Sequence, residues 1–500
     1  MFWPEQHANK ILKQRGKALV VETGITPSGP IHVGNLREVL TADFVVKAIG
    51  DRAKINFFLV IDDFDPLRKV YPFLDQSFSE HVGKPLFLIP CPGDCKDHES
   101  YADHFLTPFV DSLNQLNVDL AIKRASQLYQ SGVYTKAITK VIEQRQKVRK
   151  ILEDVSQRKL EADWFPFNPL CAKCQKLRAK VTEFDLAKTQ VQYSCPDCGG
   201  RGVADFSKGE GKLAWRIDWA CRWWIFKVNV EPFGKDHASP GGSYETGERI
   251  AKEVFDSPAP YPIIYERVHL RGEGAMHSST GVAIEASEIL KAVSPTLIRY
   301  FFARSQVDRH IEFDTGEGIT QLYDDYRQLR TTDPVFNAST VEPLPNVPYR
   351  HIVMVYQAAA KKVDQLLNGL KRTGHSIKDK KTLERLLPKI EQWLSLYAPA
   401  QYRFEISQSL PAKVKQLSKE QKAYLKAVLA LIEQKTDLSG EQLHSELHRL
   451  RKDLAIKPKV AFSSIYLIFL GKDSGPQAGW FLAAIDRSFV LKRLKEATAK

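Results

Sequence analysis

The sequence contains no hydrophobic run long enough to cross a membrane as a helix. Such a helix needs about 18 consecutive apolar residues, and the longest candidate, residues 460–470, is shorter and contains two serines. The first residues, MFWPEQHANKILKQRG, have neither the uninterrupted apolar core nor the small-residue cleavage site of a signal peptide. We therefore expect no membrane partner and no export, and we place the protein in the cytoplasm.

Cysteine is also scarce, with 7 residues in a chain of 500. The number is odd, and four of the cysteines form two C-x2-C pairs. In a reducing compartment such pairs indicate metal ligation before disulfides. We find no internal repeat and no low-complexity tract, and the 43% hydrophobic and 26% charged residues are ordinary values for a folded protein.

Length and charge set the scale of the molecule. A chain of 500 residues suggests roughly three domains. Its 72 lysines and arginines exceed its 59 acidic residues and give a formal net charge of +13. This excess is expected of a protein that meets nucleic acid or nucleotide phosphates, although solubility alone is an alternative explanation.

The first part of the chain has the pattern of a β-turn-α-β unit. KALVVE (17–22) reads as a strand, TGITPSGPIHVGN as a turn, and residues 36–48 keep an apolar stripe at helical spacing. INFFLVIDD reads as a second buried strand that ends in acidic residues, and PLFLIP and PIIYERV read as further strands. With helical patterns at 101–116 and 244–255, these predict an α/β domain with a doubly wound, Rossmann-like parallel sheet.

A change in residue composition along the chain predicts an inserted module and a helical C-terminal part. Residues 125–212 combine charged helices, proline-marked loops and cysteine pairs, whereas only helical patterns recur after Phe313. We therefore expect a catalytic domain with a zinc-binding insertion and an all-α C-terminal domain. The predicted parts are residues 1–124 and 213–282 for the two halves of the nucleotide-binding domain, 125–212 for the insertion, 283–330 for a helical region and 331–500 for the α-helical domain.

The strongest local motif is TPSGPIHVGN between the first strand and the first helix. Its small residues let a backbone approach a phosphate, and His32 and Asn35 can donate hydrogen bonds at a helix N-terminus that already favours anions. The alternative is a tight strand-to-helix turn in which Asn35 or His32 only caps the helix. The distinctive part is the HxGN tetrad at the start of the helix.

Two groups of residues have the composition of metal sites. Cys171, Cys174, Cys195 and Cys198 have the spacing of a zinc ribbon, in which four thiolates close a tetrahedral shell around a structural ion. A second group, Cys91, Cys95, His98 and His104, combines sulfur and imidazole ligands that suit zinc, or is a coincidence of loop composition. The remaining cysteine, Cys221, lies in an apolar segment and is expected in the core.

Several separated segments together resemble the class I lysyl-tRNA synthetase family. These segments are ETGITPSGPIHVGNLRE, WRIDWACRW, EPFGKDHASPGGSYETG, YDDYRQL and AAIDRSFVLKRL, and they occur in the family's order over nearly the whole chain. HxGN is similar to the HIGH motif of class I synthetases. The resemblance implies ATP-dependent activation of lysine to lysyl-adenylate, transfer to tRNA(Lys), ATP with Mg²⁺, and one or two structural Zn²⁺ ions that include the second Cys/His group.

The resemblance also implies roles for individual residues. Catalytic positions are His32, Gly34, Asn35, Met276, Ser278 and Ser279. Lysine contacts fall on Gly24, Thr26, Trp215, His237 and Tyr265, with Asp218 beside them as a source of negative charge. The ATP positions are Pro27, Ser28, Gly29, His32, Asn35 and Asp236. An ammonium group favours carboxylate, carbonyl or aromatic partners, which fits this set, although buried tryptophans and tyrosines are commonly plain core residues.

One motif departs from the family pattern. The KMSKS loop of class I synthetases corresponds to Ala275–Ser279 here, where Met276 and Ser279 keep their places but Ala275 and Ser278 replace the two lysines. Because charge-assisted contacts are roughly twice as strong as neutral ones, loss of the two lysines weakens the contacts of the loop with the negatively charged pyrophosphate. Three alternatives follow: a slower synthetase in which Arg271 or His277 contributes charge, a paralogue that binds tRNA or lysine without activating it, and adenylate transfer to another amine-bearing acid.

The helical C-terminal third contains clusters of basic residues with aromatic residues between them. Lysines and arginines there suit phosphates, and Trp393, Tyr397 and Tyr402 suit stacking with unpaired bases. The resemblance implies that residues 283–330 form a helical stem-contact region and that residues 331–500 form a helical domain that binds the tRNA anticodon. An ordinary solvated helix bundle is the alternative.

Overall fold

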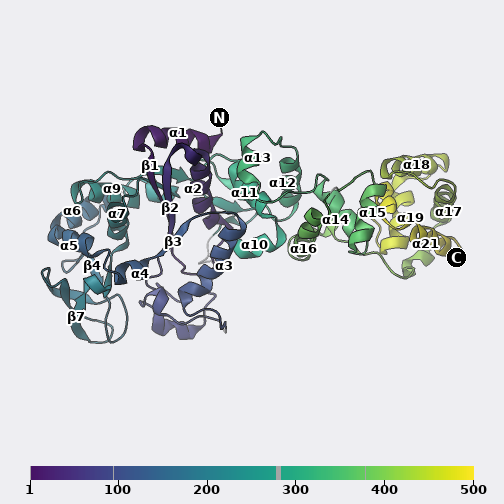
Figure 1. Cartoon of the computed structure of the whole chain (residues 1–500). Helices are drawn as coiled ribbons and strands as arrows, with labels where there is room; N and C mark the ends of the chain where they lie inside the picture. Colours follow the sequence, from purple (N-terminus) through teal and green to yellow (C-terminus); the bar gives the residue numbers. More distant parts are fainter. Residues whose placement is uncertain (1, 94, 277–282, 378, 500) are drawn as a thin grey trace. The chain divides into compact units, whose positions relative to one another are not determined.

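The structure, a computed structural model, describes residues 2–93, 95–276, 283–377 and 379–499 (Figure 1). The chain divides into two compact units. The first comprises Met1–Leu290, Ile298–Phe313 and Thr331–Val341, and the second comprises Lys291–Leu297, Asp314–Arg330 and Glu342–Lys500. Our finer, five-part division of the chain stays a prediction.

A five-stranded sheet forms the centre of the first unit, in the order β10-β9-β1-β2-β3. All of its strand pairs are parallel. The chain runs outward from β1 to β2 and β3 on one side and later to β9 and β10 on the other, so the order reverses between β1 and β9. Such a reversal opens a crevice at the carboxyl ends of these strands. The predicted α/β fold with a doubly wound parallel sheet is confirmed; the strands are β1 (Ala18–Ile25), β2 (Lys54–Ile61), β3 (Ala121–Arg124), β9 (Val230–Gly234) and β10 (Tyr261–Tyr265).

Helix α2 (Leu36–Ile49) leads directly away from this crevice. It follows β1 through the 3₁₀ helix η1 (Val33–Asn35), and its apolar stripe is buried as the periodicity predicts. Buried Asp43 on α2 is paired with Arg299 at 2.7 Å, which ties α2 to α11 within the first unit. The other elements of the first unit outside the insertion are α1 (Trp3–Arg15), α3 (Tyr101–Gln115), α7 (Trp215–Phe226), α8 (Lys235–Ala238), α9 (Ser243–Glu253), α13 (Pro334–Ser339), and the small sheet of β11 (Val268–Leu270), β12 (Gly274–Ala275) and β13 (Ile311–Phe313).

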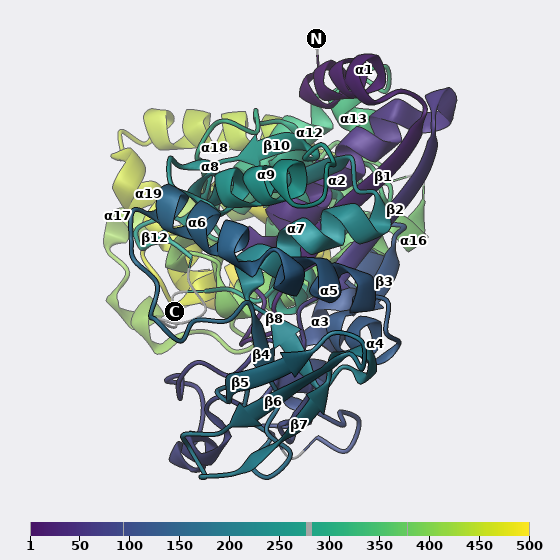
Figure 2. The same ribbon diagram turned by 90° about the vertical axis from the view of Figure 1, so that its left-hand side faces the viewer.

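The inserted module lies between β3 and α7 and is built from three helices and two small antiparallel sheets. Figure 2 shows its strands together, apart from the parallel sheet. Its buried residues belong to the same hydrophobic core as those of β2 and α7, so the module is part of the first unit. The elements are α4 (Ala125–Gln130), α5 (Thr135–Glu143), α6 (Arg145–Ser156), the pair β4 (Phe167–Pro169) with β8 (Gly211–Leu213), and the sheet of β5 (Lys180–Asp185), β6 (Gln190–Ser194) and β7 (Arg201–Asp205).

One predicted strand is wrong. PLFLIP forms the 3₁₀ helix η4 (Leu86–Leu88) and packs in a small core beneath the loop after β2. Its two prolines, Pro85 and Pro90, lack the N–H groups that a central strand needs, and only four residues lie between them. The apolar run therefore marks a buried loop and not a sheet position.

The second unit is helical throughout its described residues, as predicted for the C-terminal part. Trp393 is fully buried there, and its indole N–H donates to the Thr315 carbonyl at 2.8 Å, so it is not available to stack on a base. Among the described residues no helix is both long and apolar enough to span a bilayer. Helices α10 (Ala286–Ala292) and α11 (Pro295–Ala303) contribute to both units, followed by α12 (Glu317–Arg327), α14 (Tyr349–Ala358), α15 (Val363–Arg372), α16 (Lys380–Leu396), α17 (Lys419–Gln434), α18 (Gly440–Asp453), α19 (Pro458–Leu470), α20 (Ala478–Ala484) and α21 (Arg487–Ala499).

Candidate active site and metal-ligand clusters

Two adjoining cavities occupy the crevice at the carboxyl ends of β1 and β9. The first, which we call the acidic cavity, has a volume of about 480 Å³. The second, the HxGN cavity, has a volume of about 250 Å³ and is lined by His32, Gly34 and Asn35 of the HxGN tetrad. Both are lined by Gly24, Ile25, Glu38 and His237. Groups bound in the two cavities therefore meet at these four residues.

The acidic cavity joins carboxylates to aromatic rings. Four of the predicted lysine-contacting residues, Gly24, Thr26, Trp215 and His237, line it. Burial lowers the pKa of His237 and keeps its imidazole neutral near pH 7. Such a lining attracts a cation with an aliphatic stem. The carboxylates in the wall are Glu38, Asp62, Asp65 and Glu231, and the rings are Trp215, Trp219 and Phe233.

Two of these carboxylates already hold internal cations. Lys212 Nζ lies 3.4 Å from Asp62 and in direct contact with Asp65, and Arg222 Nη2 lies 2.7 Å from Asp62. Burial disfavours the charged form of Asp62, but Arg222 and Lys212 outweigh it and lower the pKa of this carboxyl. Asp62 and Asp65 are thus committed to buried ion pairs.

Asp218, predicted beside the lysine contacts, lies behind the cavity wall. It is fully buried, accepts a hydrogen bond from the Tyr134 hydroxyl at 2.8 Å and lies 3.2 Å from Lys212 Nζ. Its carboxylate also approaches Arg222 to 3.6 Å. Asp218 does not line either cavity, so it influences a ligand through the two internal cations.

Glu38 and Glu231 differ from the other wall carboxylates because no lysine or arginine among the described residues lies within ion-pair distance of them. Glu38 accepts hydrogen bonds from the Gly24 amide at 2.9 Å and from the Tyr265 hydroxyl at 2.7 Å. Burial raises its pKa to about 7 although both bonds act in the opposite direction. Glu231 accepts indole N–H bonds from Trp219 at 2.8 Å and from Trp223, and burial likewise raises its pKa.

The HxGN cavity places the tetrad at the start of α2. The His32 amide donates to Asn35 Oδ1 at 3.1 Å, which fixes the turn into the helix. A side chain on Gly34 would approach the His32 ring to 2.8 Å, so only glycine permits this ring position. The structure thus brings His32, Gly34 and Asn35 together at a helix N-terminus, where anions are favoured.

The lining of the HxGN cavity also includes two cations with acidic partners. Lys235 Nζ lies 2.5 Å from Glu266, and the Arg267 guanidinium makes two 2.7 Å bonds with Asp236. Asp236, a predicted ATP contact, therefore lines the cavity as one half of an ion pair. Tyr265, predicted for lysine, lines this cavity and reaches the other through Glu38.

The remaining predicted residues of the site divide into three groups. Pro27, Ser28 and Gly29 do not line either cavity; the Ser28 carbonyl accepts a hydrogen bond from Tyr101, and Gly29 packs under Phe73. Met276 is buried and lines the HxGN cavity. Ser278 and Ser279, like His277, lie outside the described residues.

The four ribbon cysteines converge as predicted. Their sulfur atoms lie within 4.8 Å of one another, with 3.6 Å between Cys171 and Cys198 and between Cys174 and Cys195. Sulfur atoms around a tetrahedral Zn²⁺ with bonds of about 2.3 Å are about 3.8 Å apart, so the donor set fits this ion. Cys171 follows β4, and the amide of Leu170 donates to the carbonyl of Glu210 at 3.0 Å, which connects the cluster to β8.

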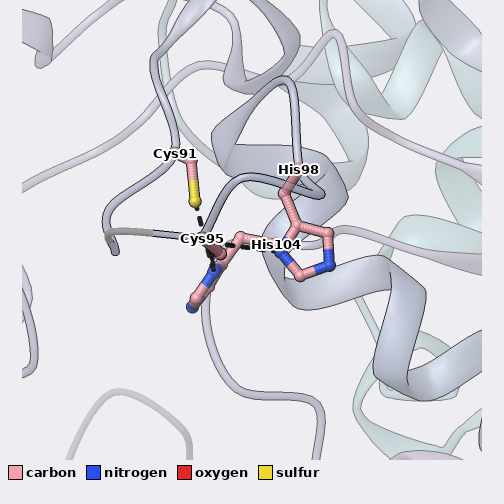
Figure 3. A group of neighbouring side chains, drawn as sticks. All are labelled: Cys91, Cys95, His98 and His104. Carbon is pink, nitrogen blue, oxygen red and sulfur yellow. Dashed lines mark hydrogen bonds between the residues drawn. The ribbon is translucent and has the colours of Figure 1, made fainter.

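The second group also converges (Figure 3). The ligand atoms of Cys91, Cys95, His98 and His104 lie within 4.8 Å of one another. Cys95 Sγ is 3.2 Å from Nδ1 of both histidines, and Cys91 Sγ is 3.4 Å from His104 Nδ1. Two thiolates and two imidazoles are a donor set that suits Zn²⁺.

Sequence reasoning missed several residues of the acidic cavity. Glu38 stands three positions after the tetrad and interrupts an otherwise apolar helix face, which is a detectable signal. Glu231 is the first residue of the quoted EPFGKDHASPGGSYETG segment but was given no role, and Asp65 follows the acidic end of β2. The sequence near Lys212 gives no sign of its role, because its acidic partners approach it only in the folded structure.

Comparisons with known proteins agree with this geometry. A family model described as "tRNA synthetases class I (K)" matches residues 1–344, and one described as "Anticodon binding domain" matches residues 360–498. A lysine–tRNA ligase from Methanosarcina barkeri (strain Fusaro / DSM 804) is 43% identical and aligns with 100% of this chain and 98% of its own length. One from Archaeoglobus fulgidus is 39% identical over 99% of this chain and 100% of its own length. The chain therefore belongs to the class I (K) tRNA synthetase family.

Proposed function

We propose that the protein is an ATP-dependent lysine–tRNA ligase, which activates lysine to lysyl-adenylate and transfers it to tRNA(Lys). The observation that carries this proposal is the acidic cavity with two wall carboxylates, Glu38 and Glu231, that lack an internal cation. Lysine has two ammonium groups and an aliphatic stem, which match two such carboxylates and the rings of Trp215 and Trp219. Full-length relatives named lysine–tRNA ligase support the same reaction.

The adjoining cavities suit the first step of the reaction. ATP binds in the HxGN cavity. Lysine in the acidic cavity directs its carboxylate toward the four residues that line both cavities. The carboxylate attacks the α-phosphorus, a new P–O bond forms, and the bond to pyrophosphate breaks. His32 and Asn35 donate hydrogen bonds to phosphate oxygens at the start of α2, which stabilises the charge of the transition state. Mg²⁺, carried by the ATP phosphates, supplies further neutralisation of that charge.

The HxGN cavity contains positive charge although the loop lacks its two lysines. Lys235 and Arg267 line it, and each is held by one carboxylate, Glu266 or Asp236. Both side chains are about half or more exposed, at 63% and 47%, so they can reorient toward a polyphosphate. These two cations support an active synthetase. No observation favours the binding-only paralogue. No observation favours a different amine-bearing acid.

The tRNA partner is supported by the helical second unit. Residues 360–498 match an anticodon-binding domain. A cavity of about 550 Å³ in this unit is lined by Lys361, Arg403 and Lys472, by the carboxylates of Glu391 and Glu405, and by Phe404 and Gln408. Cations suited to phosphates and an aromatic ring suited to a base are the usual components of a single-stranded RNA site. We assign this cavity to an unpaired nucleotide of the tRNA.

Both metal clusters are proposed to hold structural Zn²⁺. Each offers four protein ligands and so leaves no open coordination position for catalysis. A reducing compartment such as the predicted cytoplasm keeps the thiols available as ligands. Two zinc ions per chain in the purified protein is the expected stoichiometry.

Lysine-dependent ATP–pyrophosphate exchange tests the proposed reaction directly. The zinc-loaded protein should incorporate labelled pyrophosphate into ATP when lysine is present and not when it is omitted. Exchange with each of the other amino acids in turn tests the specificity. Tight binding of tRNA with no exchange above background would instead identify a binding-only paralogue.

A further inference from the structure

The turn that carries Ser28 is held by a residue outside the two cavities. Tyr101, the first residue of α3, is fully buried, and its hydroxyl donates to the Ser28 carbonyl with 2.7 Å between the oxygens. Burial raises the pKa of this phenol well above its ordinary value, so the group stays protonated and remains a donor. One hydrogen bond thus connects α3 to the turn between β1 and η1.

Ring packing makes a second connection to the same turn. A side chain on Gly29 would approach Phe73 to 2.6 Å, which shows how closely the Phe73 ring covers the backbone. The ring of Phe105 lies 5.6 Å from that of Phe73 and 5.0 Å from that of Tyr101. Phe73, supported by Phe105, therefore packs on Gly29, while Tyr101 holds the adjacent Ser28 by a hydrogen bond.

The start of the turn has few backbone N–H donors of its own, whereas its end is held by backbone hydrogen bonds of Ile31 with Ala286 and of Val33 with Ile284. Pro27 and Pro30 have no N–H group to donate, and the Ser28 amide bonds to the Thr26 carbonyl at 2.8 Å. Thr26 lines the acidic cavity, and His32 lines the HxGN cavity. A displacement of this short segment therefore alters the relation between the two cavities.

The second metal cluster brackets Tyr101. His98 precedes it by three residues, and His104 follows it by three residues, one helical turn along α3. The His104 ring lies 4.7 Å from the Phe105 ring. Cys91 and Cys95 belong to the loop before α3 (Figure 3), so an ion bound to all four residues joins that loop to the first turns of the helix.

We propose that Tyr101 is a positioning residue for the nucleotide-binding turn, and that the metal ion of the Cys91–Cys95–His98–His104 cluster fixes the start of α3 so that Tyr101 holds the Ser28 carbonyl. The inference rests on the proposed function only in assigning this turn to ATP. Metal binding at the cluster therefore acts on ATP affinity through these two contacts with the turn.

The first experiment separates metal occupancy from turn order. Zinc content and hydrogen–deuterium exchange of a peptide covering residues 26–35 are measured for the full-length wild type and for Cys95→Ser. The wild type should hold two zinc ions per chain, and Cys95→Ser should hold one and exchange the peptide at least several-fold faster. A wild-type value of one zinc, or unchanged exchange in a variant that has lost zinc, would overturn the proposal.

The second experiment tests Tyr101 without touching a ligand. Tyr101→Phe keeps the ring and removes the donor, so it should retain two zinc ions and raise KM for ATP about five-fold, the equivalent of one neutral hydrogen bond. Tyr323→Phe is the matched control, because its buried hydroxyl also donates to a backbone carbonyl, that of Pro345 at 2.8 Å, in the second unit. The control should leave KM for ATP unchanged.

These readouts distinguish failure of the inference from failure of the proposed function. Faster exchange of the 26–35 peptide in Tyr101→Phe supports the positioning role even where the wild type shows no lysine activation. An unchanged KM for ATP together with unchanged exchange in Tyr101→Phe rejects the role, while normal lysine activation by the same protein leaves the proposed function intact.

Discussion

The Tyr265 hydroxyl donates a hydrogen bond to the Glu38 carboxylate, with 2.7 Å between the two oxygens. Tyr265 ends β10 and Glu38 lies in the first turns of α2, so the bond joins the far side of the crevice to the helix that follows the HxGN tetrad. With the Gly24 amide as its other partner, Glu38 is held rigidly at the junction of the two cavities. An ammonium group at that junction completes its hydrogen bonding.

Replacement of Glu38 tests this assignment. Glu38→Gln keeps the size and removes the charge, and loss of one charge-assisted hydrogen bond costs about 1.5–3 kcal/mol, so KM for lysine should rise about ten- to a hundred-fold. The change is measured by ATP–pyrophosphate exchange. Glu441→Gln, at an exposed position in the second unit, is the control. Equal KM values for lysine in Glu38→Gln and the wild type contradict the role.

The pH dependence of lysine binding follows from the same carboxylate. Burial raises the pKa of Glu38 to about 7. Below that pH the group is protonated and no longer attracts an ammonium, and above it the group is charged. KM for lysine should therefore rise as the pH falls from 8 to 6, while KM in Glu38→Gln should stay nearly flat over this interval. A parallel rise in both proteins would assign the effect to another group.

Much of the fold follows from local sequence patterns. The buried run of β2, the apolar stripe of α2 and the paired cysteines are each visible within a short window, and each is where the pattern predicts it. PLFLIP fails because a short apolar run does not distinguish a strand from a buried loop. Trp393 likewise has the composition of a stacking residue, but the packing of the helices buries it.

The acidic cavity was harder to predict because its charges pair over long distances in the chain. Lys212 contacts Asp65 across 147 positions, and Arg222 contacts Asp62 across 160. The sequence around Lys212 or Arg222 gives no sign that either residue forms a buried ion pair. Glu231 also looks like an ordinary strand residue until the indole N–H groups of Trp219 and Trp223 are seen to meet at its carboxylate.

Lys212 is predicted to be essential for the stability of the first unit. Its ammonium lies among Asp62, Asp65 and Asp218, all buried. Lys212→Met removes the cation beside Asp65 and leaves Asp62 and Asp218 with Arg222 alone, which should cost about 3–5 kcal/mol in the free energy of unfolding. Thermal and denaturant unfolding measure the loss, with the exposed neighbour Lys208→Met as a control. Addition of Asp65→Asn to Lys212→Met should recover part of the stability, and no recovery would mean that the ion pair is not its source.

Charge reversal in the second unit tests the tRNA site. The exposed Lys472 lines the cavity there, and its ammonium donates to the Arg403 carbonyl at 3.2 Å. Lys472→Glu should raise KM for tRNA several-fold and reduce the salt dependence of binding, because one phosphate contact is lost. Lysine-dependent ATP–pyrophosphate exchange should be unchanged. Lys419→Glu, an exposed position outside the cavity lining, is the control, and an equal effect of both variants would show only a general charge effect.

The ribbon cluster is expected to influence lysine binding at a distance. Cys171 follows β4, which pairs with β8, and β8 carries Lys212 opposite Asn168. Loss of zinc in Cys195→Ser loosens this pair, so the ammonium of Lys212 no longer holds Asp62 and Asp65 in the cavity wall. Zinc content should fall by one ion per chain, and the dissociation constant for lysine, measured by calorimetry without ATP, should rise. Cys221→Ser, a buried position outside both clusters, should retain both ions. Unchanged lysine affinity in a Cys195→Ser protein that has lost zinc would show that β8 keeps its place without the ion.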